Sequence, residues 1–293
     1  MGTTIWAGLV QGAIYALVAS GFTLSLLPSG VFNFAQGALV VSGSYLTYLW
    51  LHTLGLPSVV ALVLNLVAGL LMGVVCELVT VRPLRFARGV VQGGPAELVT
   101  TVGMATMLIG LISVIWGTDP LRVPWNGPAR VVNAIGVHAD PVEIVVVGAS
   151  IVVAVGLFAV FRYTRMGQAC RAVAEDREAA MLRGVNVDLL SIGAFACAGA
   201  LAGVVSMAIG PVTFAIPTLA NSLALGGFVA LAIGGEGSFL GALGGGLVIG
   251  LVSAFAARYI DVNYANLSIL ALLLVTLSVR PKGLGGAAEA RSV

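Results

Sequence analysis

Side chains able to do acid–base or metal chemistry are scarce in this 293-residue sequence, and those present do not converge. The two histidines, His52 and His138, have no suitable partner nearby in the sequence, and the three cysteines lack metal or disulfide spacing. No acidic residue falls near the centre of a long apolar run, so a proton relay lacks its usual parts. We predict no catalytic residues and no metal site.

Hydrogen-bonding side chains gather instead in the segment Pro28–Gly37. Asn33 and Gln36 are three residues apart there and could face one side of a helical turn. Two interpretations stay open: a broken-helix turn that lines a translocation path, or a contact in which both amides hydrogen-bond across a helix bundle. The first predicts a path formed by Phe32, Asn33, Phe34, Gln36, Gly37 and Asn221.

A second segment, Arg162–Asp188, lies between long apolar runs and carries nine of the chain's 26 charged residues, so it must lie in water. With a 3.6-residue period it is amphipathic, and glycines at Gly167 and Gly184 are expected to break the helix at both ends. Taken alone, a linker helix on the membrane surface is as good an interpretation as a docking helix. Its predicted apolar stripe contains Met166, Ala169, Cys170, Val173, Ala174, Ala180 and Met181.

The elements that position these segments are membrane helices. The sequence is 59% hydrophobic and 9% charged, with a mean hydropathy of +1.07, whereas soluble domains are about 25% charged. Its apolar runs are longer and more continuous than the alternating segments of a β-barrel. We therefore predict an all-α, polytopic helical bundle of about 8–10 membrane-embedded helices, forming one domain over residues 1–293. A net charge of +2 gives no sign of nucleic-acid binding.

Nine apolar spans are expected, and two of them are short enough to be broken or re-entrant. The short spans are Ala38–Leu51 and Ser222–Ile233. The others are Ile5–Leu27, Ser58–Val81, Leu98–Trp116, Val142–Phe161, Leu189–Ile209, Phe239–Ala257 and Ala265–Val279.

Basic residues set the expected orientation. They follow the third, fifth and last spans, which places these three regions in the cytoplasm and the N-terminus outside. The turn-rich loop 117–141 is then external. A weak echo between Gly12–Gly21, followed by Pro28, and Gly199–Gly210, followed by Pro211, suggests an internal repeat. The basic residues used are Arg82, Arg85, Arg88, Arg162, Arg165, Arg171, Arg177, Arg183, Arg280, Lys282 and Arg291.

With these motifs, the chain resembles the membrane subunit of bacterial branched-chain amino acid ABC importers over essentially its whole length. Arg162–Asp188 is similar to the family signature R-Y-[ST]-R-M-G-R-A-x-R-A-x-A-x-D…G-[IV]-N-x-D, with Gln168 in place of one arginine. Residues 178–184 also fit the importer motif EAA-x3-G, which docks onto the ATPase. Supporting matches are Phe32–Gly37 (I-N-F-A-H-G in the family), Arg82–Arg85, Gly234–Ala242 and Arg280–Leu284.

The resemblance implies a cytoplasmic coupling segment at residues 162–188. It also implies a second permease subunit, identical or paralogous, two cytoplasmic ATPases that use ATP and Mg²⁺, an extracytoplasmic solute-binding protein, and location in the bacterial inner membrane. The chain itself has no phosphate-binding loop and is expected to bind no cofactor. The coupling residues implied are Arg165, Gly167, Arg171, Glu175, Asp176, Glu178, Ala179, Ala180, Arg183 and Gly184.

One departure bears on the substrate. The family's histidine in N-F-A-H-G is Gln36 here, and an amide keeps hydrogen bonding but loses titration. Branched-chain amino acids and related small amides, urea or carboxylates all remain open as solutes. The alternative function is a secondary transporter or channel that needs no ATPase. An enzyme is not expected, since no acid, histidine or cysteine constellation is present.

Overall fold

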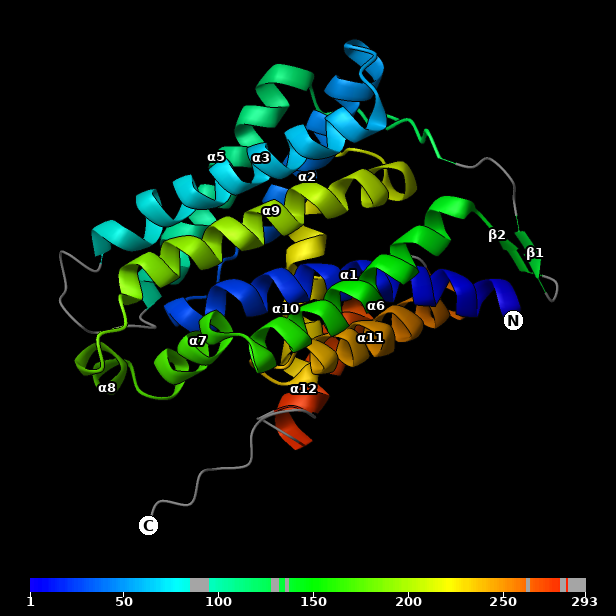
Figure 1. The fold of residues 1–293 in the computed structure, drawn as a ribbon. Helices are drawn as coiled ribbons and strands as arrows, with labels where there is room; N and C mark the ends of the chain where they lie inside the picture. The colour runs from blue at the N-terminus through cyan, green and yellow to red at the C-terminus, as the bar shows by residue number, and fades with distance from the viewer. Residues whose placement is uncertain (85–94, 128–131, 135–136, 262–263, 280–282, 284–293) are drawn as a thin grey trace.

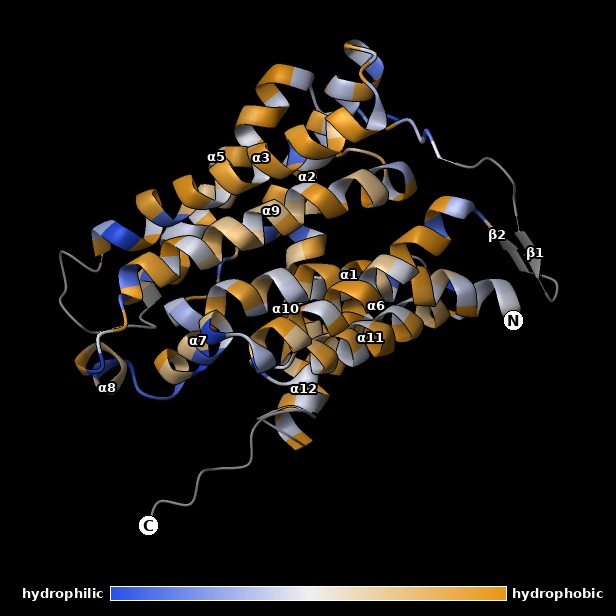
Figure 2. Ribbon diagram, viewed as in Figure 1, coloured by the Kyte–Doolittle hydropathy of each residue, from blue (hydrophilic) through white to orange (hydrophobic). Residues whose placement is uncertain are grey.

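The computed structural model describes residues 1–293 except 85–94, 128–131, 135–136, 262–263, 280–282 and 284–293. It is a bundle of long apolar helices (Figures 1 and 2). Within the described residues, six helices are long and apolar enough to cross a membrane, and two shorter apolar helices accompany them. The prediction of a polytopic helical membrane protein is confirmed.

The helices follow in an order close to the predicted spans. The first part of the chain contains α1 (Gly2–Ser29), α2 (Gln36–Tyr48), η1 (Leu49–Thr53), α3 (Ser58–Cys76), η2 (Glu77–Val81), α5 (Pro95–Trp116) and a small antiparallel hairpin of β1 (Val132–Ala134) and β2 (Val137–Ala139). The second part contains α6 (Pro141–Tyr163), α7 (Arg165–Glu175), α8 (Arg177–Leu182), α9 (Val187–Thr213), α10 (Leu219–Gly234), α11 (Phe239–Tyr259) and α12 (Tyr264–Val279).

The internal echo corresponds to a structural repeat. In each half a long helix with a proline near its end, α1 or α9, is followed by a short irregular segment and a short helix, α2 or α10. The partners match as well, because α1 packs most extensively on α11 and α9 on α3. Figure 1 shows α1 and α9 running in opposite directions, so the repeat is inverted, an arrangement known in transporters.

Glycines allow these helix pairs to pack backbone against backbone. A Cβ on Gly250 of α11 would overlap backbone atoms of Gly8 and Gly12 on α1. In the other half, a Cβ on Gly199 of α9 would overlap the carbonyl oxygen of Gly69 on α3. Small residues at membrane helix interfaces allow such approaches, because packing drives association where water does not.

The bundle has two chemically different ends. Figure 1 shows α7 and α8 at one end, and the N-terminus with β1 and β2 at the other. Figure 2 shows hydrophilic colouring gathered around α7 and α8. Since α7 and α8 carry the arginine-rich segment, the distribution of basic residues predicts that this end faces the cytoplasm and that the N-terminus is external. Of the other basic residues used for this assignment, Arg82 directly follows η2, whereas Arg85, Arg88, Arg280, Lys282 and Arg291 lie outside the described residues.

Candidate translocation and coupling sites

The turn between α1 and α2 is the centre of the first candidate site. Helix α1 ends at Ser29, and Gly30 caps it in a left-handed conformation, with φ 70°. The following segment enters the bundle, where Asn33 is fully buried. The Oδ1 atom of Asn33 accepts hydrogen bonds from the Ala35 amide at 3.2 Å and the Cys76 thiol at 3.4 Å. A tight Asx-type turn therefore starts α2 inside the bundle.

Gln36, the first residue of α2, points away from Asn33. Its Nε2 atom donates to the carbonyl oxygen of Ala198, near the middle of α9, at 3.1 Å. The side chain fits because Gly21 of α1 has no Cβ; one placed there would overlap the Gln36 amide. The expectation that both amides face one side of a helical turn is wrong, because Asn33 precedes the helix and bonds to its own turn and to α3.

Each of these buried amides leaves one atom without a protein partner among the described residues. They are Nδ2 of Asn33 and Oε1 of Gln36, in side chains at most 1% exposed. Leaving such a buried atom unsatisfied costs about 1–3 kcal/mol. An unsatisfied buried atom needs an explanation. In a transport protein, these two atoms can gain a hydrogen-bond partner in another conformation of the chain or from a passing molecule.

Four phenylalanine rings surround this turn. Phe34 lies between Phe22 of α1 and Phe228 of α10, with ring centroids 5.9 and 5.5 Å away, and Phe32 contacts Phe228 at 5.7 Å. Phe32, Phe34 and Phe228 are only partly buried, and Asn221 is exposed. Sequence reasoning missed Phe228, although it lies seven residues after Asn221 and so on the same helical face.

The starts of the two short helices meet inside the bundle. A Cβ on Gly37 of α2 would overlap the carbonyl oxygen of Ala220 on α10, so the two backbones cross in direct contact. Neither helix has a side-chain cap at its N-terminus. Two positive helix-dipole ends therefore lie close together at the level of Gln36, where they favour a negatively charged group.

Thus Asn33, Gln36 and Gly37 lie inside the bundle as structural contacts in this conformation. The accessible members of the predicted path are the two phenylalanines and Asn221. Both interpretations of the polar turn are represented. The broken helix exists, and the amides also make the cross-bundle contacts of the simpler reading.

The cytoplasmic segment forms two helices rather than one. Thr164 caps α7 by accepting from the Gly167 amide at 3.1 Å, and Asp176 caps α8 by accepting from Ala179 at 3.0 Å. The break lies at Asp176, whose extended backbone ends α7 and starts α8. The expectation that Gly167 breaks the helix is wrong, because Gly167 lies inside α7 with its Cα pressed on the Phe161 backbone. Gly184, with φ +84°, does end α8.

The apolar face of this segment is narrower than predicted. Gly167, Cys170, Val173 and Ala180 are buried, on a cluster that contains Phe161 of α6, Leu24 of α1, Leu190 and Ala198 of α9, and Phe239 of α11. Met166, Ala174 and Met181 are exposed and lie outside this face, and Met181 also follows the break at Asp176, which changes the helical phase.

The polar face of α7 and α8 is exposed. Arg177 pairs with Asp188 at 3.8 Å and holds α8 against the start of α9. Leu182 is 90% exposed at the end of α8, which is unusual for a leucine beside so many charges. The other residues predicted for coupling are exposed, apart from half-buried Ala179 and buried Gly167 and Ala180; the exposed ones are Arg165, Arg171, Glu175, Asp176, Glu178, Arg183 and Gly184.

A cavity of about 690 Å³ joins the two candidate sites. One wall is α7, with Arg171 and Glu175, and the other contains Phe32 and the exposed Glu236 of the α10–α11 turn. The cytoplasmic segment therefore lies across a polar chamber from the broken-helix turn. A movement of α7 would change this chamber directly.

Broken helices in an inverted repeat, with polar groups where they meet, are an arrangement typical of solute-transporting membrane proteins. Comparison with known proteins specifies the class: the family described as "Branched-chain amino acid transport system / permease component" matches residues 4–277. The chain belongs to this family. It is the permease component of an ABC-type transporter, a transport subunit rather than a known enzyme, and a multi-pass protein of the inner membrane.

Individual relatives are moderately similar over nearly the whole chain. The permease protein LivH of the high-affinity branched-chain amino acid transport system of Escherichia coli K12 is 29% identical, over 98% of this chain and 96% of LivH. BraD of Pseudomonas aeruginosa is 30% identical over the same shares. The ribose import permease RbsC of Haemophilus influenzae is 26% identical over 92% of this chain and 82% of RbsC. No solved structure matches this chain.

Proposed function

We propose that this chain imports branched-chain amino acids, or related small amino-acid, amide or carboxylate solutes, by ATP-driven alternating access. In this proposal it pairs with a second permease subunit, identical or paralogous. Two cytoplasmic ATPases supply ATP and Mg²⁺ chemistry, and an external binding protein delivers the solute. The relatives named for branched-chain amino acid transport support the solute class.

The observation that carries the proposal is that α7 and α8 have one face buried against the membrane helices and one face that is charged and exposed. Their buried face packs against α1, α6 and α9 near the cytoplasmic ends of these helices, and their charged face is open. A partner that binds the open face can therefore move three membrane helices together. A channel or an ion-coupled carrier has no need of a helix pair that is buried on one face and charged on the other. An ATPase partner that binds the charged face accounts for α7 and α8 best.

The broken helices supply the path in this proposal. Phe32, Phe34, Phe228 and Asn221 form the accessible surface that one subunit contributes to it. The two uncapped helix N-termini behind this surface favour the carboxylate of a passing solute, and the aromatic rings suit a branched apolar side chain. The amides of Asn33 and Gln36 shape the turn.

The coupling assignment is tested with two variants in the reconstituted complex. Gly184→Pro places proline where φ is +84°, which its ring forbids, and Glu178→Lys reverses a charge on the exposed face. We expect both to insert and assemble in the membrane normally but to lose solute-stimulated ATP hydrolysis and vanadate-sensitive uptake. Asp119→Lys, an equal charge reversal on the external side, is the control and should transport normally.

Two results would contradict the proposal. Normal transport and ATPase stimulation in both variants would remove α8 from the docking surface. Uptake that persists without ATPases and resists vanadate would favour the alternative, a secondary transporter or channel.

A further inference from the structure

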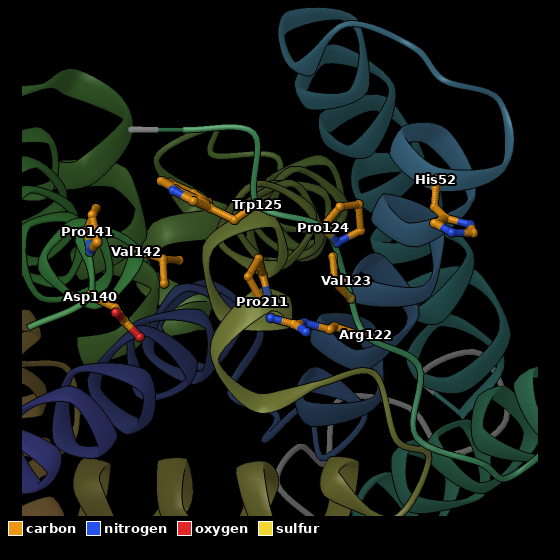
Figure 3. A pocket seen from close by; sticks show the side chains of 9 residues that line it. All are labelled: His52, Arg122, Val123, Pro124, Trp125, Asp140, Pro141, Val142 and Pro211. Carbon is orange, nitrogen blue, oxygen red and sulfur yellow. The ribbon is translucent and has the colours of Figure 1, made fainter. Parts of the chain in front are cut away.

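The external end of the bundle holds a second polar cavity, of about 560 Å³ (Figure 3). It lies between the loop after α5, the start of α6 and Pro211 near the end of α9. This cavity is far from α7 and α8, at the opposite end of the bundle. Neither the motifs nor the proposed coupling mechanism uses it.

One cation and one carboxylate stand on separate sides of this cavity. Arg122 is exposed and, within the described part of the chain, makes no hydrogen bond or ion pair. Asp140 caps α6 by accepting from the Glu143 amide, and its remaining lone pairs stay available. Figure 3 shows the guanidinium of Arg122 below Pro211 and the carboxylate of Asp140 apart from it to the left, and no ion pair joins these two described residues.

Most of the wall beside these charges is apolar and stiff. Val123 and Val142 are 3% and 8% exposed, Trp125 is half-buried, and three prolines and the exposed His52 complete the lining. A positive group and a negative group on one cavity, with apolar walls beside them, offer partners for the carboxylate, the ammonium group and the aliphatic side chain of an α-amino acid. A free guanidinium is also suited to bind a carboxylate through two parallel hydrogen bonds.

The cavity is connected to the re-entrant segment of the second repeat. Leu121, next to Arg122, exchanges two backbone hydrogen bonds with Ala215, at 3.1 and 2.9 Å. Ala215 lies between α9 and α10, beside Phe214, the only non-glycine residue with positive φ in the described chain. A ligand held by Arg122 therefore sits one residue from the bridge that fixes the segment leading into α10.

We propose that this cavity is the external receiving site, where the solute binds as a zwitterion after its binding protein releases it. Arg122 binds the carboxylate, Asp140 binds the ammonium group, and the valines with Trp125 contact the side chain. The proposal rests on the importer function above and adds a site and a ligand chemistry to it.

The test measures equilibrium binding to the purified full complex, without binding protein, using three probes. These are L-leucine, 4-methylpentanoate, which lacks the ammonium group, and 3-methylbutylamine, which lacks the carboxylate. Arg122→Gln should weaken leucine and 4-methylpentanoate by about tenfold or more. Asp140→Asn, which keeps the helix cap because asparagine caps as well as aspartate, should weaken leucine and 3-methylbutylamine but leave 4-methylpentanoate unchanged.

Arg258→Gln is the matched control, since Arg258 is another exposed arginine at the external end and lies outside this cavity. It should bind all three probes as the unaltered complex does. If Arg122→Gln binds leucine normally, or if the unaltered complex imports solute yet binds none of the probes, the receiving site is refuted while the importer function stands. If Arg122→Gln weakens only the association of the binding protein, the arginine recognises a protein carboxylate and the solute site is also refuted. Absence of ATP-driven uptake in the unaltered complex would instead refute the importer.

Discussion

Replacing Gln36 with leucine separates the structural role of its buried amide from a role in transport. The side chain is 1% exposed, donates one hydrogen bond to the Ala198 carbonyl oxygen and leaves Oε1 without a partner. Leucine is of similar size, so the substitution opens no large cavity. We expect Gln36→Leu to assemble normally, to be at least as stable as the unaltered chain, and to lose most of its transport.

The expected stability follows from two opposing contributions. Removing the hydrogen bond costs about 0.5–1.5 kcal/mol, and about 0.6 kcal/mol is the average between membrane helices. Removing the unsatisfied Oε1 recovers about 1–3 kcal/mol. With the average for membrane helices, the balance predicts a change of about 0.4–2.4 kcal/mol in favour of the variant. If the amide gains a partner only during the transport cycle, its loss slows transport by about tenfold, the equivalent of one hydrogen bond.

Two measurements decide the matter: thermal unfolding of the purified complex, and solute uptake by proteoliposomes at equal protein content. A transition temperature that falls by several degrees would mean that Gln36 has only a structural role and that its unpaired Oε1 does not destabilise the chain. Normal uptake would refute a role of the amide in transport. Gly21→Ala provides a control for packing, because its Cβ would overlap the Gln36 amide and destabilise the chain. Adding Gln36→Ala to Gly21→Ala should restore part of the lost stability, so the effects of the two substitutions should not add.

Three further predictions concern other parts of the fold. Gly167→Leu should detach α7 from the Phe161 backbone, seen as faster proteolysis of the cytoplasmic segment; unchanged proteolysis would contradict the packing. Burial raises the pKa of the Cys170 thiol to about 11, so at pH 7.5 only about 0.03% is thiolate. Maleimide labelling of Cys170 should therefore be slow at neutral pH and accelerate as the pH rises toward 11, whereas fast labelling at neutral pH would show an exposed thiol. Trp6→Phe removes the 2.6 Å hydrogen bond from the indole to Glu143, and should lower stability by about 1 kcal/mol in thermal unfolding; an unchanged transition would make this contact dispensable.

The arrangement of the helices was largely predictable because lipid imposes it. Apolar length identifies a membrane span directly, and the two short spans predicted as broken are α2 and α10. The repeat was visible only as two glycine-rich stretches followed by Pro28 and Pro211. Its inverted form depends on which helices pack together, and that information is not local in the sequence.

For the candidate translocation site, the sequence predicted which residues take part better than it predicted how they are arranged. Asn33 and Gln36 were recognised as an unusual polar pair, but their spacing suggested one shared face. The side chain of Asn33 accepts a hydrogen bond from the backbone amide of Ala35 in its own turn. Asparagine side chains often bond to nearby backbone in this way, in competition with helix formation. The partner of Gln36 is 162 residues away in sequence, beyond any local pattern.

The inverted repeat also relates the two cavities at the ends of the bundle. After α1, the segment that leads to α2 borders the cytoplasmic cavity through Phe32. After α9, the segment that leads to α10 is bridged at Ala215 to the loop that lines the external cavity. Each half of the chain thus brings one re-entrant segment to one side of the membrane, and the short helices that follow meet at Gly37 and Ala220. Because the two short helices are in direct contact, a shift of one at its own cavity must be accommodated by the other. In a mechanism that opens the two sides alternately, this contact between α2 and α10 is enough to couple the cytoplasmic cavity to the external cavity.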